Sequence, residues 1–301
     1  MQRFILRLLL FVMLFIFIDS IIGKGFDFMK NRCSGRDFGR MNYMLNKCSE
    51  DILIFGSSRA YHHYSPDIFH NVTKLSCYNC GQDGSGILLM SPIFNRIVSI
   101  HKPKCVIYDI APQFDLFKEN DNVRYLQWLK PYYDSSMEKL FNQIKEGETY
   151  KMHSKLYRYN SCFVRIIFDY LKLLPNNSFN GYVPQDGHIE RGMIKRERKE
   201  YSYDSLKLSY MENFISYCVS NNIALFFTYS PLFDGADACE YLPLSSLCKQ
   251  YRIPIIDMSN DTTFLGSKNF FKDGAHLNKE GSESYSWKIA DTINVFLSRR
   301  Q

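Results

Sequence analysis

Hydrophobic residues fill the start of the chain almost without interruption. From Phe4 to Ile22, about 19 residues pass with only Arg7, Asp19 and Ser20 as polar positions. That length is close to the roughly 20 residues with which an apolar helix spans a bilayer. A cleaved signal peptide would instead have a shorter apolar core followed by small residues at a cleavage site, and no clear site of that kind follows. We therefore expect residues 1–23 to form an uncleaved membrane anchor, followed by a juxtamembrane segment over 24–50.

The charges around the anchor do not fix its orientation by themselves. Arg3 and Arg7 precede the apolar run and favour a cytoplasmic N-terminus, but basic residues also follow it closely, at Lys24, Lys30, Arg32 and Arg36. Signal-anchor proteins with a short N-terminal tail usually place the rest of the chain outside the cytoplasm. We expect a single-pass membrane protein whose folded part is periplasmic or at the cell surface.

Beyond the anchor, short apolar runs alternate with helical patterns. Five runs are apolar on both faces, as in strands of a covered parallel sheet, and they lie at residues 52–55, 75–79, 105–110, 223–229 and 253–257. The helical patterns include a helix start at Ser65-Pro66-Asp67 and an apolar stripe over residues 279–299. This alternation predicts an α/β domain over residues 51–301, a three-layer, doubly wound parallel sheet.

One long interval breaks the alternation. Residues 119–205 are rich in helical patterns and aromatic residues, and they separate the third predicted strand from the fourth. Active sites of open α/β sheets lie at the carboxyl edge of the strands. The interval is therefore predicted to be a helical insertion, which is either a lid or substrate platform at that edge or a helical layer without such a role.

The net charge and the cysteine pattern argue against two classes of function, nucleic-acid binding and metal binding. The net charge of +6 and the pI near 8.7 suit a protein near an anionic surface but are too diffuse to indicate nucleic-acid binding. Cys77 and Cys80 form a C-x-x-C pair without a second pair or His ligands at metal-binding spacing, so we expect burial rather than a metal site. The pairing of the nine cysteines stays open, and no cofactor is expected.

Three polar motifs follow predicted strands or precede a helix. Gly56-Ser57-Ser58 comes directly after the first strand, where a serine lies near helix amides that can stabilise an oxyanion. Asp273 and His276 precede the last helix at a spacing that lets the carboxylate orient the imidazole while its other nitrogen faces a serine. The glycine-rich turn 79–86 follows the second strand, and its backbone N–H groups can approach a substrate closely.

These motifs resemble the blocks of the SGNH (GDSL) hydrolase superfamily, in particular its membrane-anchored polysaccharide-modifying type. FGSSRA at 55–60 resembles the first block, NCGQDG at 79–84 the second and DGAHLNKEG at 273–281 the last. The resemblance implies a flavodoxin-like SGNH fold, with Ser58 as nucleophile, Asp273 and His276 as its catalytic partners, and Gly84 as the oxyanion glycine.

The chain departs from the family pattern at two places. Ser57 stands where the first block usually has aspartate, a change also seen in membrane-anchored polysaccharide-modifying branches. The Gly-x-Asn-Asp of the third block is absent, and Gln113 is the nearest side chain that could replace its asparagine as an oxyanion donor. Arg59 and His62, next to the nucleophile, are candidate substrate-binding residues, although a surface arginine and a packed histidine are the alternatives.

The combined features predict a membrane-anchored serine esterase or O-acyltransferase. Its expected substrate is an acyl ester, acetyl foremost, of an extracytoplasmic glycan or glycolipid, and a membrane acyltransferase is a candidate partner. The alternative is a degenerate SGNH-like protein that binds glycan, or serves as a partner subunit of a membrane acyl-transfer system, without turnover. The missing third-block asparagine supports this alternative, whereas the retained Ser58, Asp273 and His276 oppose it.

Overall fold

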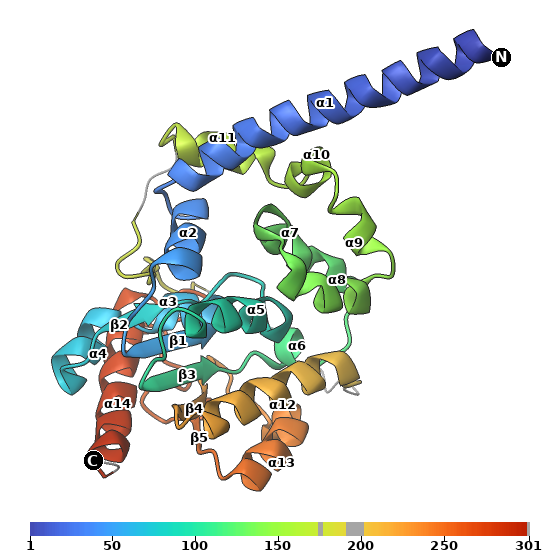
Figure 1. The fold of residues 1–301 in the computed structure, drawn as a ribbon. Coiled ribbons are helices and arrows are strands. Elements are labelled where there is room, and N and C mark those ends of the chain that lie inside the picture. The colour runs from blue at the N-terminus through green and yellow to red at the C-terminus, as the bar shows by residue number, and fades with distance from the viewer. Residues whose placement is uncertain (174–176, 191–201, 300–301) are drawn as a thin grey trace. The chain divides into compact units, whose positions relative to one another are not determined.

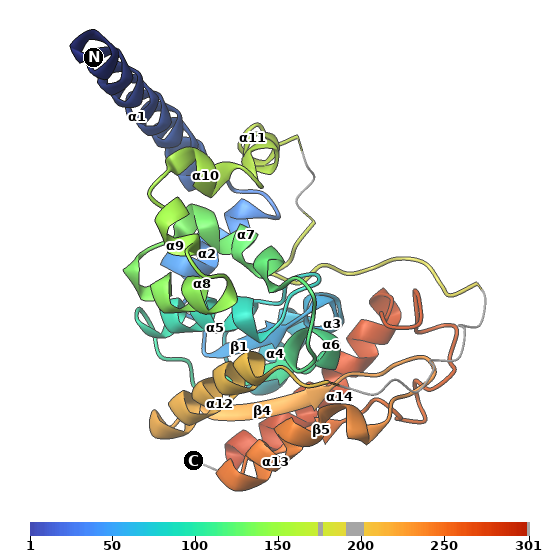
Figure 2. The ribbon, with the colours of Figure 1, turned by 90° about the vertical axis from the view of Figure 1, so that its right-hand side faces the viewer.

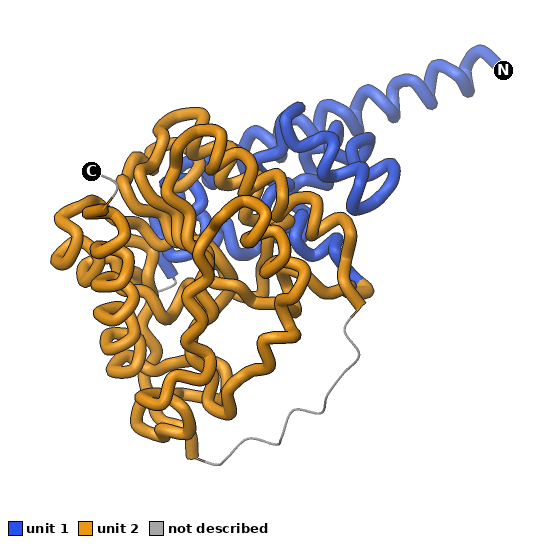
Figure 3. Tube along the Cα trace, turned by 90° about the horizontal axis from the view of Figure 1, so that it is seen from below, with its two compact units in different colours: residues 1–43, 121–176 blue, residues 44–120, 177–301 orange. Residues whose placement is uncertain are grey.

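The computed structural model describes residues 1–173, 177–190 and 202–299. The chain forms two compact units, one of residues 1–43 with 121–176 and the other of residues 44–120 with 177–301 (Figure 3). The second unit is larger and contains the β-sheet.

The larger unit is built on a five-stranded parallel sheet with the strand order β2-β1-β3-β4-β5 (Figures 1 and 2). The strands are β1 (Ile52–Gly56), β2 (Cys77–Asn79), β3 (Cys105–Asp109), β4 (Ala224–Tyr229) and β5 (Ile255–Asp257). All five strands predicted from the apolar runs are therefore confirmed. The order 2-1-3-4-5 is that of flavodoxin-like doubly wound sheets, which bind ligands at the carboxyl edge of the strands.

Helices cover both faces of this sheet. Side chains along each strand point alternately to the two faces. Ile54 belongs to the core shared with Ile289 of the C-terminal helix, while its neighbour Phe55 meets the ring of Phe214 on the opposite face. The helices of this unit are α3 (Ser58–His63), α4 (Pro66–Thr73), α5 (Ile87–Val98), α6 (Pro112–Asp115), α12 (Ser205–Ser220), the 3-10 turn η4 (Ala238–Tyr241), α13 (Leu242–Tyr251) and α14 (Lys279–Ser298). The three-layer α/β prediction is thus confirmed.

The outer edge of β2 is covered by a segment that the sequence pattern assigned to the insertion. The backbone N–H of Asn79 donates to the carbonyl of Asn180 at 2.9 Å, and Phe179 and Tyr182 form an isolated antiparallel bridge. Gly181 has a φ of 87°, and a Cβ there would lie 2.0 Å from the carbonyl oxygen of Asn79. Residues 179–182 of the predicted insertion therefore belong with the sheet, because their backbone packs against β2.

The smaller unit contains the N-terminal helix and the remainder of the insertion. Helix α1 (Gln2–Arg32) continues beyond Gly23, where the sequence pattern ended the anchor, and α2 (Phe38–Asn46) follows. The insertion forms short helices and turns: η1 (Asn122–Tyr125), α7 (Leu126–Leu129), η2 (Lys130–Tyr132), η3 (Ser135–Met137), α8 (Glu138–Ile144), α9 (Glu148–Lys151), α10 (Lys155–Tyr159) and α11 (Phe163–Tyr170). A small core of Phe38, Tyr159 and Ile166 joins these parts.

Helix α1 is long and apolar enough to cross a membrane, and it is the single helix of that kind in the described part of the chain. The side chains from Met1 to Ile18 are exposed in this unit, although nearly all are apolar. Figure 1 shows this half of the helix projecting away from α10 and α11, which lie along its C-terminal half. Those features make α1 a candidate membrane span.

Candidate active site

Ser58 lies where β1 turns into α3. The turn begins at Gly56, whose φ of 138° and close contact with the carbonyl oxygen of Asp109, 2.5 Å from where a Cβ would stand, leave no room for a side chain. Ser57 occupies the N-cap position and Ser58 is the first residue of the helix. The nucleophile candidate therefore lies at the carboxyl end of an inner strand of the sheet, as the sequence pattern predicts, and its side chain is half-buried.

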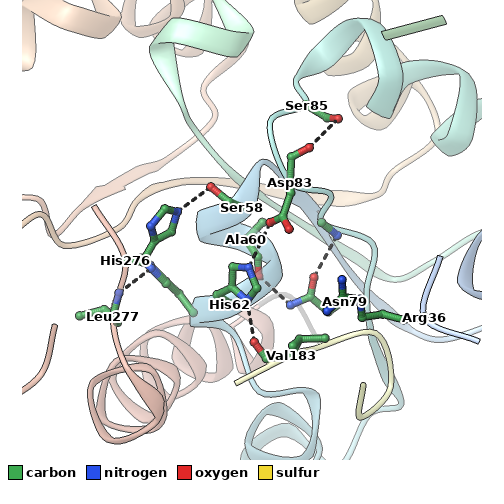
Figure 4. Close-up of polar contacts among 12 residues, drawn as sticks. Arg36, Ser58, Ala60, His62, Asn79, Asp83, Ser85, Val183, His276 and Leu277 are labelled. Carbon is green, nitrogen blue, oxygen red and sulfur yellow. Dashed lines mark hydrogen bonds and ion pairs between the residues drawn. The ribbon is translucent and has the colours of Figure 1, made fainter. Parts of the chain in front are cut away.

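His276 reaches Ser58 from a loop 218 residues later in the chain. Its Nε2 lies 2.8 Å from Oγ of Ser58 (Figure 4), and its Nδ1 lies 2.9 Å from Oδ2 of Asp273. A carboxylate at Nδ1 keeps the hydrogen on that nitrogen, so Nε2 is free to accept the proton of the serine hydroxyl. The structure therefore brings together the three predicted catalytic side chains in the order that a serine nucleophile requires.

The carboxylate of Asp273 is held in its ionised form. Burial acts to raise the pKa of this group, but the hydrogen bond from the His276 ring and the backbone N–H groups of Ala275 and His276, each donating at 2.9 Å, outweigh it and lower the pKa to about 2. The same N–H bonds fold the loop back on itself around the carboxylate. Asp273 thus orients the imidazole and also shapes the loop that carries it.

His63 supports the other side of this loop. The backbone N–H of Leu277 donates to Nε2 of His63 at 2.9 Å, and the His63 side chain is fully buried. Burial, reinforced by the positive charge of Arg59, lowers the pKa of His63 well below its ordinary value. His63 is therefore neutral, and its Nε2 accepts a hydrogen bond from the residue next to His276. No local motif indicated this role, because the contact joins residues 214 positions apart.

The glycine-rich turn is fixed to the strand and helix that carry Ser58. Asn79 donates through Nδ2 to the carbonyls of Ala60 and Tyr64 at 2.7 and 3.0 Å, and its Oδ1 accepts from the N–H of Gly81 at 2.9 Å (Figure 4). Within the turn, Gly84 has a φ of 59°, and a Cβ added there would meet nothing within 4 Å. The predicted oxyanion glycine therefore has the left-handed backbone that favours glycine.

An acid missed by the sequence pattern fixes the end of this turn. Asp115 is fully buried and accepts hydrogen bonds from the N–H of Ile87 at 2.9 Å, the N–H of Ala111 at 2.8 Å and the hydroxyl of Tyr108 at 2.6 Å. Burial outweighs these bonds and raises its pKa to about 6. Asp115 thereby joins the start of α5, which follows the glycine-rich turn, to the segment after β3. Its spacing resembled an ordinary helix-start acid and gave no sign of this role.

Gln113 lies on α6, after β3, and its side chain is exposed. The structure records no hydrogen bond between this side chain and Ser58, His276 or Gly84. Its assignment as a side-chain donor to an oxyanion stays a prediction.

His62 lies beside the site, with both ring nitrogens bound inside the protein. Nδ1 lies 2.7 Å from the carbonyl oxygen of Val183 and Nε2 lies 3.0 Å from Oδ1 of Asp83 (Figure 4). Its ring centre is 6.0 Å from that of His276. These contacts link the nucleophile helix to the glycine-rich turn, and the expected substrate-binding role of His62 stays a prediction.

Arg59 is placed in the core, away from a substrate surface. Its Nη2 donates to the carbonyl of Ile110, and its guanidinium stacks over the ring of Tyr229, with 4.8 Å from Cζ to the ring centre. The side chain is 4% exposed, and the charge of Asp109 favours its protonated form. These contacts fix α3 to the end of β3, and they do not support the expectation that Arg59 binds substrate.

Comparisons with known proteins find similar structures but no similar sequences. No protein-family model matches the chain, and no curated protein matches it. A solved structure assigned to the lipolytic G-D-S-L family, from Desulfitobacterium hafniense, is 11% identical, with 79% of this chain and 97% of that chain covered and a TM-score of 0.42. An acetyl xylan esterase is also 11% identical, with 80% and 97% covered and a TM-score of 0.38. The chain is similar in fold to these proteins.

Proposed function

We propose that this protein is a membrane-anchored serine esterase or O-acyltransferase. Its substrates would be acyl esters, acetyl foremost, of an extracytoplasmic glycan or glycolipid. The observation that carries the proposal is the contact of 2.8 Å between Nε2 of His276 and Oγ of Ser58, with Nδ1 of the same ring held by Asp273. A serine hydroxyl is a weak nucleophile until a base of this kind removes its proton.

The first half of the reaction transfers the acyl group to Ser58. Its Oγ attacks the acyl carbonyl carbon while Nε2 of His276 takes the hydroxyl proton, and Asp273 stabilises the imidazolium that forms. The carbonyl oxygen becomes an oxyanion, which the backbone N–H groups of Ser58 and Gly84 would bind. When the carbon–oxygen bond to the leaving alcohol breaks, His276 returns the proton to that alcohol and an acyl-serine remains.

The second half frees the serine. A water molecule or a sugar hydroxyl gives its proton to His276 and attacks the acyl-serine carbonyl, and the acid or the new ester leaves as Ser58 recovers its proton. Water makes the protein an esterase, and a sugar hydroxyl makes it a transferase. The same three side chains serve both outcomes. Which one occurs depends on whether water or a sugar hydroxyl reaches the acyl-serine.

The substrate class is supported by α1 and by the resemblance of residues 55–60, 79–84 and 273–281 to SGNH hydrolases. A membrane anchor restricts the domain to substrates at or near the membrane surface, which glycans of the cell envelope and glycolipids satisfy. An integral membrane acyltransferase would fit as a partner that supplies acyl groups. The orientation that we propose places the larger unit outside the cytoplasm.

A binding protein without turnover is the alternative function. The absence of a third-block asparagine favours it, because an active site that lacks one oxyanion donor loses on the order of 10²–10³ in rate. The contacts from Asp273 through His276 to Ser58 argue against it, since glycan binding requires no proton path to a serine. We therefore favour the enzyme.

A fluorophosphonate probe tests the nucleophile directly, because it phosphonylates an activated serine and needs no knowledge of the acyl group. The full chain in detergent should be labelled, Ser58→Ala should not, and His276→Ala should be labelled slowly. Ser57→Ala is a matched control, because it changes the neighbouring serine and should keep the label. If neither the native chain nor Ser57→Ala is labelled, Ser58 is not an activated nucleophile and the binding protein is the better description.

Hydrolysis and transfer are separated by a second assay. Acetate release from a chromogenic acetyl ester is measured with and without added oligosaccharide acceptors. An esterase releases acetate at the same rate in both, whereas a transferase gives acetylated oligosaccharide that mass spectrometry detects. Ser58→Ala supplies the background in each case.

A further inference from the structure

Helix α11 of the smaller unit has one face that packs against the protein, called here its anchored face, and one that is exposed, called here its bare face. On the anchored face, the buried carboxylate of Asp169 accepts from the backbone N–H groups of Gly35, Phe38 and Gly39 at 2.6, 2.8 and 3.2 Å. Ile166 packs into the small core on the same side. Because these contacts fix the rotation of α11 about its axis, the direction of its other face is also fixed.

The bare face carries a stripe of apolar side chains. Val164, Phe168 and Leu171 are spaced by four and three residues, so they lie above one another on a helix surface. They are 45%, 43% and 55% exposed. The basic side chains of Arg165 and Lys172, each next in sequence to a residue of the stripe, are exposed as well. An apolar stripe with exposed basic residues beside it is typical of a helix that lies in the interface of a membrane.

The neighbouring helix α10 packs on α1 at the end of its apolar run. The buried carboxylate of Asp19 accepts from Oγ of Ser154 at 2.6 Å and from the N–H groups of Lys155 and Leu156 at 2.8 and 2.9 Å. One turn later, a Cβ at Gly23 would lie 2.2 Å from Cβ of Lys155, so glycine is needed for this close approach. The start of α10 therefore satisfies the one acid within the apolar run.

The length of α1 sets the depth of this contact in a bilayer. At about 1.5 Å per residue, the rise from Phe4 to Asp19 is about 22 Å, which is short of the roughly 30 Å hydrocarbon core. The rise from Phe4 to Gly23 is about 28 Å. The turn that contains Asp19 and Gly23 therefore lies at the hydrocarbon boundary when α1 spans the membrane, and α10 lies at the same level.

We propose that the 164/168/171 face of α11 lies in the headgroup layer of the bilayer that α1 spans, so that the smaller unit is a membrane-interface module. The proposal rests on the membrane anchor of the proposed function. Ring centres 6.4 Å apart in the pairs Phe26–Phe163 and Phe28–Tyr170 place α11 against α1 just beyond Gly23, next to the apolar half of α1, and this position identifies the occupant as lipid. Lys24 and Lys172 are exposed and are placed to contact lipid phosphates. Arg165 and Arg32 are exposed as well, and their guanidinium groups lie over the rings of Trp128 and Phe28.

Site-specific fluorescence in reconstituted vesicles tests the proposal. Single cysteines are introduced in the full chain with Cys239→Ser, because Cys239 is exposed and the other eight native cysteines are buried. Phe168→Cys reports on α11 and Phe11→Cys on the anchor. Tyr150→Cys, at a 79% exposed aromatic position on α9, is the matched control from the same unit. Each carries an environment-sensitive dye, in vesicles of phosphatidylcholine and phosphatidylglycerol with or without brominated acyl chains.

The expected result is a blue-shifted dye that brominated lipid quenches at positions 168 and 11, and a water-exposed, unquenched dye at position 150. Quenching at 11 without quenching at 168 overturns the inference and leaves the anchor intact. An unquenched dye at both positions shows that α1 does not span the membrane, and both the proposed anchor and this inference are then wrong. Fluorophosphonate labelling of Ser58, unchanged in each variant, verifies that the chain is folded.

Discussion

His63 accepts a hydrogen bond from the backbone N–H of Leu277, so the residue that follows His276 is held by a side chain from the helix that begins at Ser58. Ser58 begins that helix and His63 ends it. The helix therefore contacts the His276 loop twice, through the nucleophile and through this bond. We regard His63 as a positioning residue, because it acts on the reaction through the backbone beside His276.

Replacement of His63 by leucine should weaken catalysis by way of this loop. The N–H of Leu277 would then be buried without an acceptor, which costs about 1–3 kcal/mol, and the loop would shift to relieve it. We expect the rate of fluorophosphonate labelling to fall about tenfold and the unfolding temperature to fall as well. Labelling reactions quenched at successive times measure the rate, and circular dichroism measures the unfolding temperature.

His63→Gln is the matched control for this change. Its amide oxygen can accept the same N–H while it removes the imidazole, so labelling should recover most of the native rate. If leucine and glutamine are equally slow, the imidazole itself participates and the positioning role is wrong. If both retain the native rate, the bond to Leu277 does not position the loop.

The sequence predicted the sheet well because each strand is a local signal. The run from Ile52 to Phe55 is apolar and ends at a glycine, and the other strands are bounded in similar ways. Once the strands are placed, a parallel sheet brings their carboxyl ends to one edge, which is why Ser58 and the glycine-rich turn could be expected to meet.

The supporting contacts could not be predicted in this way. His63 meets Leu277 and Asp115 meets Ile87 across long stretches of chain, and neither residue type nor spacing reveals which buried N–H needs an acceptor. Arg59 follows the candidate nucleophile in sequence, which suggested a substrate-binding role, but its guanidinium donates to the carbonyl of Ile110 and stacks on the ring of Tyr229 inside the protein. The partners of these side chains are set by tertiary packing and not by the local sequence.

Asp273→Asn should retain the shape of the loop but lose most of the reactivity. The amide N–H group of asparagine can donate to Nδ1 of His276, so that the ring hydrogen lies on Nε2 and the ring cannot accept the serine proton. In serine triads this change lowers the rate by about 10⁴-fold. Labelling rates of the variant and the native chain measure the effect. Asp261→Asn is the control, because Asp261 also lies before α14 and pairs with Lys288 at 3.0 Å outside the site. Equal rates for Asp273→Asn and Asp261→Asn would contradict the triad.

The same carboxylate should make folding sensitive to strongly acidic pH. The pKa of Asp273 is about 2 in the folded chain, below the ordinary value of 3.8. A depressed carboxyl pKa stabilises the folded state above the ordinary value, and this contribution is lost as the pH falls from about 4 to about 2. We expect the unfolding temperature of the native chain to fall more steeply over this window than that of Asp273→Asn. Parallel slopes would show that the carboxylate does not stabilise the loop.

Gly84→Ala tests the backbone side of the oxyanion site. Its φ of 59° disfavours any side chain, although a Cβ would have open space, so the substitution costs on the order of 1 kcal/mol in strain. Gly147→Ala, in the smaller unit, is the control, with a φ of 75° and no atom nearer to an added Cβ than Cδ2 of Tyr150 at 3.9 Å. Both should lose similar stability. We expect the rate of ester hydrolysis to fall at least tenfold only for Gly84→Ala, and equal activity losses would remove Gly84 from the oxyanion site.

Gln113→Ala decides whether a side chain completes that site. The segment after β3 lies at the same sheet edge as Ser58, because Gly56 and Asp109 pair in register at the ends of their strands. If the amide of Gln113 swings toward the oxyanion when substrate binds, its loss should lower kcat by about 10²–10³ with little change in KM. Gln127→Ala, at another exposed glutamine on a short helix, is the control and should be unchanged. Unchanged turnover in Gln113→Ala would mean that the N–H groups of Ser58 and Gly84 hold the oxyanion without it, and the enzyme would then work with a two-donor site.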